Sequence, residues 1–375
     1  MTEPDRASIE QAIAGFTDPD LERDYVAAGC VQSIEIDGGR VAVAIRLGYP
    51  LATVREERAA AVRERIEAVA GVESAQVRID WAVEAGPVQT NARELEGVKN
   101  IIAVASAKGG VGKSTTAANI ALALRAEGAS VGMLDADIYG PSQPRMLGIE
   151  GKPDSPDGKT LIPLENHGIQ AMSIGFLVDP ESPMIWRGPM VTQALEQMLY
   201  STQWRSLDYL VVDLPPGTGD IQLTLAQKVP LSGAVIVTTP QDIALLDARK
   251  GLKMFEKVSV PVLGIVENMS IHVCSNCGHA EPIFGEGGGA KMAEDYGVRL
   301  LGQLPLELAI RTQADSGTPT VVADPDSQAA VTYREIARRA AAAQRTGCEL
   351  CRGGAAQLAS GALPSGFPHI RIVDD

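Results

Sequence analysis

Residues 106–115 read SAKGGVGKST, and they connect a run of apolar residues to a stretch with helical periodicity. A glycine-rich loop between a strand and a helix N-terminus forms a phosphate site, because its backbone N–H groups point inward and the helix dipole favours negative charge. The stretch fits the pattern G-x-x-x-x-G-K-[ST] except at its first position, where Ala107 replaces glycine. In this pattern Lys113 reaches the β- and γ-phosphates and the Ser114 hydroxyl binds Mg²⁺. The loop therefore predicts binding of ATP with Mg²⁺.

Two further apolar runs in the same region end in carboxylates. Residues 131–134 are followed by Asp135 and, two positions later, Asp137, and residues 209–212 are followed by Asp213. The carboxyl ends of parallel strands lie at one edge of a sheet, where such folds place their ligands. An apolar strand that ends in aspartate after a phosphate loop is typical of a Walker B strand. The sequence therefore predicts that Asp213 holds Mg²⁺ together with the serine of the loop.

The alternation of strands and helices predicts the fold class. From Val98 onward, short apolar runs alternate with longer helical stretches, which is typical of a parallel sheet covered on both faces. These runs are residues 101–105, 131–134, 209–212, 234–237 and 262–266. We therefore expect an α/β protein, a P-loop NTPase domain with a mostly parallel sheet preceded by a small α+β domain.

The chain of 375 residues is long enough for two domains. Residues 1–88 favour the order helix, strand, strand, helix, strand and form the small α+β domain. Residues 89–97 are expected to be a linker and residues 98–345 the ATPase domain. Residues 346–375, rich in Gly, Ala and Ser, are expected to be a flexible tail.

The composition argues against two classes of partner. The net charge is −14 and aromatic residues make up 4% of the chain, so binding to nucleic acid or to an anionic membrane surface is not expected. No stretch approaches the roughly 20 apolar residues that span a bilayer. Residues 1–5 are acidic and lack the order of a signal peptide, so we expect a cytoplasmic location.

Four of the five cysteines form two C-x-x-C pairs, Cys274/Cys277 and Cys348/Cys351. In an intracellular protein such pairs more often bind a metal or act as redox-active thiols than form structural disulfides. Two thiolates do not complete a tetrahedral site, so either neighbouring histidines or a second subunit would supply the other ligands. For the first pair, an iron–sulfur cluster, zinc and a redox disulfide all remain open.

The other cysteines carry weaker signals. The second pair lies in the expected tail, where an auxiliary cluster ligand, a redox pair and exposed thiols without a role are all open interpretations. Cys30 stands where the first strand of the small domain begins, and we expect it to be a small buried hydrophobe.

Lys108 gives the loop the form KGGVGKST, which resembles the deviant phosphate loop of the ParA/MinD/nitrogenase-iron-protein superfamily. The run KGGVGKSTTAANIALAL, DADIYGPSQPRMLG, WRGPM, VVDLPPGTGD, ENMS, the C-x-x-C and IFGEGGG follows the order of the Mrp/ApbC family of iron–sulfur ATPases. The match covers roughly residues 98–345. The first domain, through DPDLERDYVAAGCVQSIEIDGGRVAVAI, is similar to the small iron–sulfur-assembly domain often fused ahead of that ATPase.

The resemblance implies a homodimer that carries iron–sulfur clusters to apo-proteins under the control of ATP. It also implies cluster assembly factors as partners. A [4Fe–4S] cluster would bridge two protomers through Cys274 and Cys277. Asn268 would contact adenine, Asp137 would position the attacking water, and Lys108 would reach the partner's nucleotide. The residues implied to bind the nucleotide are Lys108, Gly109, Gly110, Val111, Gly112, Lys113, Ser114, Thr115 and Asn268; those implied in catalysis are Lys108, Lys113 and Asp137.

Other readings of the same residues predict different functions. A positioning ATPase of the ParA or MinD type would bind DNA or membrane, which calls for a basic patch or a basic amphipathic helix, whereas this chain ends in two aspartates. An electron donor would cycle the redox state of its cluster during ATP hydrolysis. A zinc-binding ATP switch would use the cysteine pair for a structural metal.

Overall fold

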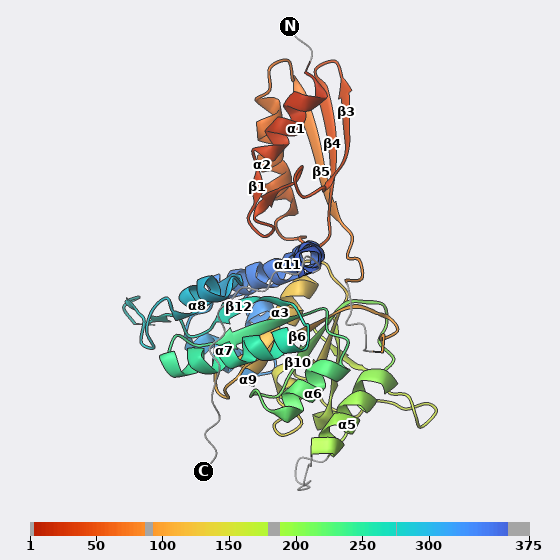
Figure 1. The fold of residues 1–375 in the computed structure, drawn as a ribbon, viewed down its shortest axis with the longest axis vertical. Coiled ribbons are helices and arrows are strands. Elements are labelled where there is room, and N and C mark those ends of the chain that lie inside the picture. The colour runs from red at the N-terminus through yellow and green to blue at the C-terminus, as the bar shows by residue number, and fades with distance from the viewer. Residues whose placement is uncertain (1–3, 87–92, 179–187, 275, 359–375) are drawn as a thin grey trace.

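The computed structural model describes residues 4–86, 93–178, 188–274 and 276–358, with the side chains of residues 345–358 outside the description. Figure 1 shows a small domain standing on one side of a larger one, with α11 (Gln328–Leu358) at the junction. In this part of the chain, no helix is both long and apolar enough to cross a membrane.

The small domain is built from the elements expected from its sequence pattern. Its helices are α1 (Arg6–Ala14) and α2 (Arg55–Glu67), and its main strands are β3 (Val31–Asp37), β4 (Arg40–Leu47) and β5 (Ser74–Trp81). A short antiparallel pair, β1 (Thr17–Asp18) and β2 (Arg23–Asp24), precedes them. Strands β3 and β4 form an antiparallel hairpin, and β5 pairs with β4 in parallel after the α2 crossover. Cys30 is buried, as expected.

The larger domain contains an eight-stranded sheet in the order β15-β12-β11-β6-β10-β7-β9-β8. All of its neighbouring strands are parallel except β8 and β9. The fold class is therefore confirmed, and each of the five apolar runs is a strand of this sheet. The strands are β6 (Val98–Ala105), β7 (Val131–Asp135), β8 (Leu164–Asn166), β9 (Ile169–Ser173), β10 (Leu207–Asp213), β11 (Gly233–Thr238), β12 (Val262–Glu267) and β15 (Leu300–Gln303).

Helices cover this sheet, and α3 packs between it and α11. Because α3 is enclosed on several sides, ten of its 14 residues are buried, among them every residue from Thr116 to Leu124. The helices are α3 (Lys113–Ala126), α4 (Gln143–Met146), α5 (Gly188–Ser201), α6 (Asp220–Lys228), α7 (Asp242–Lys257), α8 (Gly288–Tyr296), α9 (Leu308–Asp315) and α10 (Thr320–Ala323), with α11 last.

The end of α11 falls where the sequence predicts a flexible tail. The backbone of residues 346–358 continues this helix, so the first part of that stretch is helical in the structure. Both Cys348 and Cys351 belong to it, but their side chains lie outside the described residues. The role of this second pair stays a prediction, and residues 359–375 lie outside the description.

A buried ionic network joins the two domains. From α11, Arg338 donates to Asp20 of the small domain (Nε to Oδ2, 2.9 Å) and to Glu127, which caps the end of α3. The Glu127 carboxylate also accepts from the backbone N–H of Thr53 at 3.0 Å, and Asp20 also pairs with Arg58. The four charged residues are 0–5% exposed. A buried charge of this kind is stable only while its partner is present.

Replacing Arg338 with alanine should therefore lower the free energy of unfolding by about 3 kcal/mol, because Glu127 would stay buried without its cation. Urea unfolding of the full chain, followed by circular dichroism, measures this change. Arg311→Ala is the control, since Arg311 and Asp315 form an exposed pair at 3.5 Å that should contribute less than about 1 kcal/mol. Equal losses of unfolding free energy in the two variants would contradict the prediction that the buried network stabilises the fold more than an exposed ion pair does.

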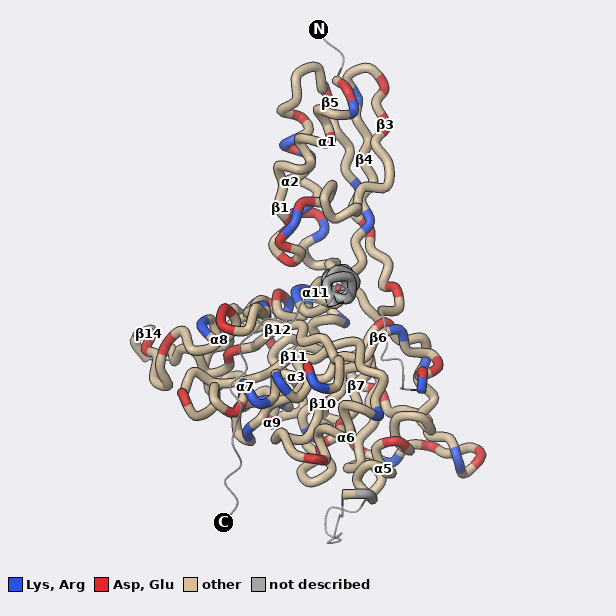
Figure 2. The backbone as a smooth tube through the Cα atoms, viewed as in Figure 1, with Lys and Arg blue, Asp and Glu red and all other residues tan. Residues whose placement is uncertain are grey.

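Acidic and basic residues are intermixed along both domains, as Figure 2 shows. Several exposed ion pairs account for this mixture, among them Lys99 with Asp208 at 2.8 Å and Lys228 with Glu196 at 3.1 Å. By sequence, residues 1–88 hold 9 basic and 16 acidic residues and residues 89–375 hold 24 and 31, so the net charge of −14 divides into −7 and −7.

Candidate functional site

The phosphate loop connects β6 to α3, as the sequence predicts. Gly110 and Gly112 have φ angles of 81° and 82°, in the left-handed region that favours glycine. The Nδ2 of Asn268 donates a hydrogen bond of 2.8 Å to the Val111 carbonyl, so a residue just past β12 lies directly on the loop. A Cβ at Gly112 would lie 2.2 Å from that nitrogen. The glycine is therefore required by both its backbone conformation and its close neighbour.

Replacing Gly112 with alanine should weaken binding of ATP at least about tenfold, because a left-handed alanine alone costs about 1–2 kcal/mol and the clash with Asn268 adds to it. Titration with a fluorescent ATP analogue measures the change. Gly140→Ala is the control, since a Cβ there meets nothing within 4 Å and no positive φ is required. Unchanged affinity in the Gly112 variant would show that the loop tolerates another backbone path.

Lys113 lies at the centre of the site. Its ammonium nitrogen is 2.5 Å from Asp213 Oδ1, 3.2 Å from Ser114 Oγ and 3.8 Å from Asp137 Oδ2. The lysine is 6% exposed and Asp213 is fully buried. Four residues that the sequence analysis assigns to ATP, Mg²⁺ or catalysis are therefore brought together, although they come from a loop and two separate strand ends.

The three aspartates lie in different environments. Asp135 is fully buried and accepts hydrogen bonds from the Asp137 N–H (3.2 Å) and the Ser173 hydroxyl (3.1 Å). Burial, and then the charge of Asp213, raise the pKa of Asp135 to about 7. Burial also raises the pKa of Asp137, while the charge of Lys113 opposes that rise. Asp135 thus holds the backbone of the Asp137 loop, and Asp137 faces the lysine.

Sequence reasoning missed Gln143, the first residue of α4. Its Nε2 donates to Asp213 Oδ2 at 2.8 Å and to the Ser114 carbonyl at 3.0 Å, and its backbone N–H donates to Asp135 Oδ2 at 3.1 Å. The residue stands in the run DADIYGPSQPRMLG, but a single glutamine after a Pro-Ser pair matches no spacing rule. Only the contacts reveal that it joins the phosphate loop to both aspartate strands.

Lys108 is not brought to the other charged residues. It is exposed on the loop, and its carbonyl accepts a hydrogen bond of 2.9 Å from the Ser106 hydroxyl. An exposed lysine at this position is available to a second molecule, so its role across a dimer stays a prediction.

The cysteine pair lies in a small hairpin formed by β13 (His272–Val273) and β14 (Ala280–Glu281). Figure 2 places β14 at the outer edge of the larger domain, beside α8. The Cys274 N–H donates to the His279 carbonyl at 2.9 Å, and the Gly278 N–H donates to the Cys274 carbonyl at 2.8 Å. The thiol of Cys274 is partly exposed and that of Cys277 is exposed.

The surroundings of the pair favour thiolate chemistry. Hydrogen bonds from the backbone N–H groups of Cys277 and then Asn276 lower the pKa of the Cys274 thiol. One ring nitrogen of His272 is hydrogen-bonded to the Leu306 carbonyl at 3.1 Å. Among the described residues, no group of three or more His, Cys, Asp or Glu side chains could hold a metal ion. The pair itself supplies two sulfur ligands.

A short segment connects the phosphate loop to the cysteines. It begins at Asn268, which is hydrogen-bonded to the loop, and continues through Met269, which has a positive φ of 57°. Ser270 N–H then donates to the Leu304 carbonyl at 3.0 Å, and the hairpin with Cys274 follows. A displacement of the loop therefore reaches the cysteine pair through one hydrogen bond, from Asn268 to Val111, and then through the six residues of backbone that follow Asn268.

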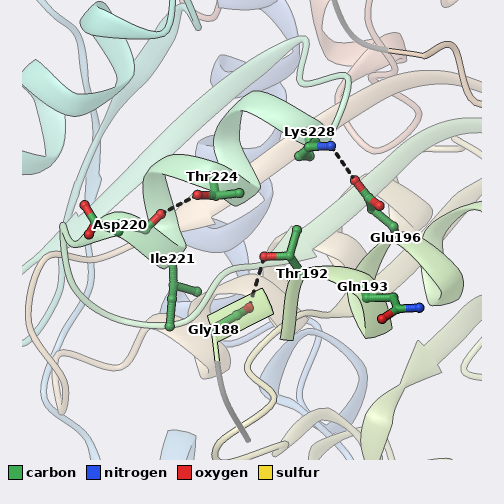
Figure 3. A pocket seen from close by; sticks show the side chains of 8 residues that line it. All are labelled: Gly188, Thr192, Gln193, Glu196, Asp220, Ile221, Thr224 and Lys228. Atoms are coloured by element: carbon green, nitrogen blue, oxygen red, sulfur yellow. Dashed lines mark hydrogen bonds and ion pairs between the residues drawn. The ribbon is translucent and has the colours of Figure 1, made fainter. Parts of the chain in front are cut away.

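A separate pocket of about 460 Å³ lies between α5 and α6 (Figure 3). The Thr192 and Thr224 hydroxyls donate to backbone carbonyls four residues earlier, and Lys228 pairs with Glu196 at 3.1 Å. These groups are already bonded within the protein. The pocket is lined by Gly188, Thr192, Gln193, Glu196, Asp220, Ile221, Thr224 and Lys228, a set distinct from the residues of the phosphate site.

Comparison with known proteins adds to this geometry. The family described as NUBPL iron-transfer P-loop NTPase matches residues 97–341, and the family described as iron-sulfur cluster assembly protein matches residues 6–79. A Pseudomonas fragi protein named iron-sulfur cluster carrier protein is 62% identical over 269 residues, which cover 71% of this chain and 94% of that protein. The protein of the same name from Escherichia coli K12 is 51% identical over 338 residues, which cover 90% of this chain and 92% of that protein.

The solved structures that this chain resembles include one that matches in both fold and sequence. It is a nucleotide-binding protein from Archaeoglobus fulgidus in complex with ADP, with a TM-score of 0.55 and 38% sequence identity. The match covers 62% of this chain and 90% of that chain. The larger domain thus shares its fold with a protein that binds a nucleotide.

Proposed function

This chain belongs to the iron-transfer P-loop NTPases of the Mrp/ApbC family, with an iron–sulfur cluster assembly domain ahead of its ATPase domain. From this we propose that it binds iron–sulfur clusters and transfers them to apo-proteins. ATP binding and hydrolysis would control the carrier. The observation that carries the proposal is the short segment from Asn268, which is hydrogen-bonded to the phosphate loop, to Cys274, which is partly exposed, and Cys277, which is exposed.

The residues around Lys113 support the proposed binding of ATP and Mg²⁺. A hydroxyl at Ser114 and a carboxylate at Asp213 are the hard oxygen donors that suit Mg²⁺, so the residues present fit this ion. Mg²⁺ would neutralise charge on the β- and γ-phosphates. Lys113 would bind the same phosphates, and Asp137 would orient the attacking water.

The cluster half rests on the pair in the hairpin. Four cysteine thiolates are the usual ligands of a [4Fe–4S] cluster. One chain offers two thiols here, one partly exposed and one exposed, and a two-fold axis beside them would bring four together. Apolar side chains nearby, Ile271, Val273 and Ile283, are 37–52% exposed and would be covered in such a homodimer. Lys108 would then reach the nucleotide of the partner protomer.

Coupling between the two halves would follow from the contact of Asn268 with the Val111 carbonyl. Nucleotide bound at the loop would favour one position of Asn268, and the segment that leads to Cys274 would follow. ATP can shift the carrier between a holding and a releasing state only to the extent that it binds the two states differently. The small domain would contact recipient proteins or assembly factors.

The test is anaerobic reconstitution of the full chain with iron and sulfide, followed by transfer to an apo-protein that needs a [4Fe–4S] cluster. We expect about four iron and four sulfide ions per dimer and a transfer rate that differs between ATP, ADP and no nucleotide. Uptake of zinc alone would instead support a zinc-binding switch. Reduction of an acceptor without loss of the cluster would support an electron donor.

A further inference from the structure

Gln143 occupies a position where three functional segments meet. The residue is 1% exposed, and it bonds to the phosphate loop at Ser114, to Asp213 at the end of β10 and to Asp135 at the end of β7. With Lys113 on Oδ1 and Gln143 on Oδ2, both oxygens of the Asp213 carboxylate are held. The orientation of the carboxylate thus depends on the glutamine.

The two partners of the side chain fix which end of its amide faces them. Asp213 Oδ2 and the Ser114 carbonyl oxygen are both acceptors, so the amide nitrogen of Gln143 must face them. The amide oxygen, Oε1, is left buried without a hydrogen-bond partner among the described residues, and so is the neighbouring Ser142 Oγ. A buried acceptor without a donor destabilises the fold, so such a group calls for a ligand or water.

We propose that Gln143 is a positioning residue for the hydrated Mg²⁺ of the nucleotide, with Oε1 accepting a hydrogen bond from a water of the ion. Mg²⁺ in proteins keeps several of its waters, and these waters are donors of the kind that Oε1 lacks. The amide of Gln143 donates to the backbone carbonyl of Ser114, whose hydroxyl would hold the ion, and to the Asp213 carboxylate, which would hold it too. This inference rests on the proposed ATP site and adds to it a residue that acts on the metal.

The inference predicts a defect that depends on Mg²⁺. Gln143→Met keeps the length of the side chain but loses both the donor and the acceptor. Groups that orient metal ligands typically contribute 10–100-fold to metal affinity. We therefore expect the Mg²⁺ concentration for half-maximal binding of a non-hydrolysable ATP analogue to rise at least about tenfold. Binding of the same analogue in EDTA should stay within about twofold of wild type.

The measurement is fluorescence titration of the full-length chain at fixed analogue and varied Mg²⁺. Gln344→Met is the matched control, because Gln344 of α11 is also a buried glutamine, 8% exposed, whose Nε2 donates to Asn100 Oδ1 of β6 at 2.6 Å. Its Mg²⁺ dependence should equal that of wild type. Gln143→Asn keeps a polar amide but is one methylene shorter, so it serves as the second variant should the methionine impair folding, and it should show the same rise.

The outcomes separate the inference from the proposed function. Wild-type Mg²⁺ dependence in folded Gln143 variants would overturn the inference and leave the ATP site intact. Equal weakening of binding with Mg²⁺ and in EDTA would also overturn it, since that pattern means a purely structural role. A wild-type chain that binds no ATP analogue at all would overturn the proposed function and this inference with it.

Discussion

Lys113→Ala should reduce ATP hydrolysis by at least about a hundredfold, to the background of the assay. The ammonium group is the one positive charge shown within 4 Å of both Asp213 and Asp137 in the described site, so it is placed to stabilise charge on the transferred phosphate. Removal of one preorganised group of this kind typically costs 10²–10³-fold in rate. Phosphate release by the purified chain under saturating ATP and Mg²⁺ measures the effect.

Loss of folding could imitate this result, because the alanine leaves buried carboxylates without their cation. Lys113→Arg addresses that point, since it keeps the charge but not the compact ammonium geometry that a phosphate loop requires. We expect the arginine variant to remain folded by circular dichroism and still fail to hydrolyse ATP. Lys99→Ala is the matched control, because Lys99 forms an exposed pair with Asp208. Hydrolysis within threefold of wild type in Lys113→Ala would remove the lysine from the mechanism.

The double variant Cys274→Ala/Cys277→Ala should take up no cluster on anaerobic reconstitution. The pair supplies every sulfur ligand of the proposed bridging cluster, so its removal leaves none of the four thiolates. ATP hydrolysis should persist, because the hairpin contributes no side chain to the group around Lys113. Iron and sulfide analysis together with phosphate release on the same preparation measures both properties.

The chain offers its own control in the second C-x-x-C pair. Cys348→Ala/Cys351→Ala removes the same number of thiols from α11 and should leave the iron content at the wild-type value. If iron remained in the Cys274/Cys277 variant and disappeared from the Cys348/Cys351 variant, the cluster would belong to α11. Retention of iron in both variants would show that the ligands lie elsewhere.

The sequence by itself determined the fold class and the elements that build the nucleotide site. Residues 106–115 and the strand ends at Asp135 and Asp213 could be recognised because each is a local pattern. A glycine-rich loop, a helix start or an apolar strand depends on residues next to one another in the chain. Parallel pairing then brings the strand ends to one edge of the sheet, so the convergence of Lys113 and the aspartates could also be expected.

Only the tertiary structure decided which distant side chains meet. Gln143 bonds to Asp213 across 70 residues of sequence, Asn268 to Val111 across 157, and Arg338 to Asp20 across 318. The path of the folded backbone selects each hydrogen-bond partner, and spacing along the chain does not. Periodicity of the sequence therefore could not predict these three contacts. The local sequence thus determined the phosphate loop and the C-x-x-C turn. The packing of helices on the sheet decided which residues brace the loop, link it to the cysteines and join the two domains.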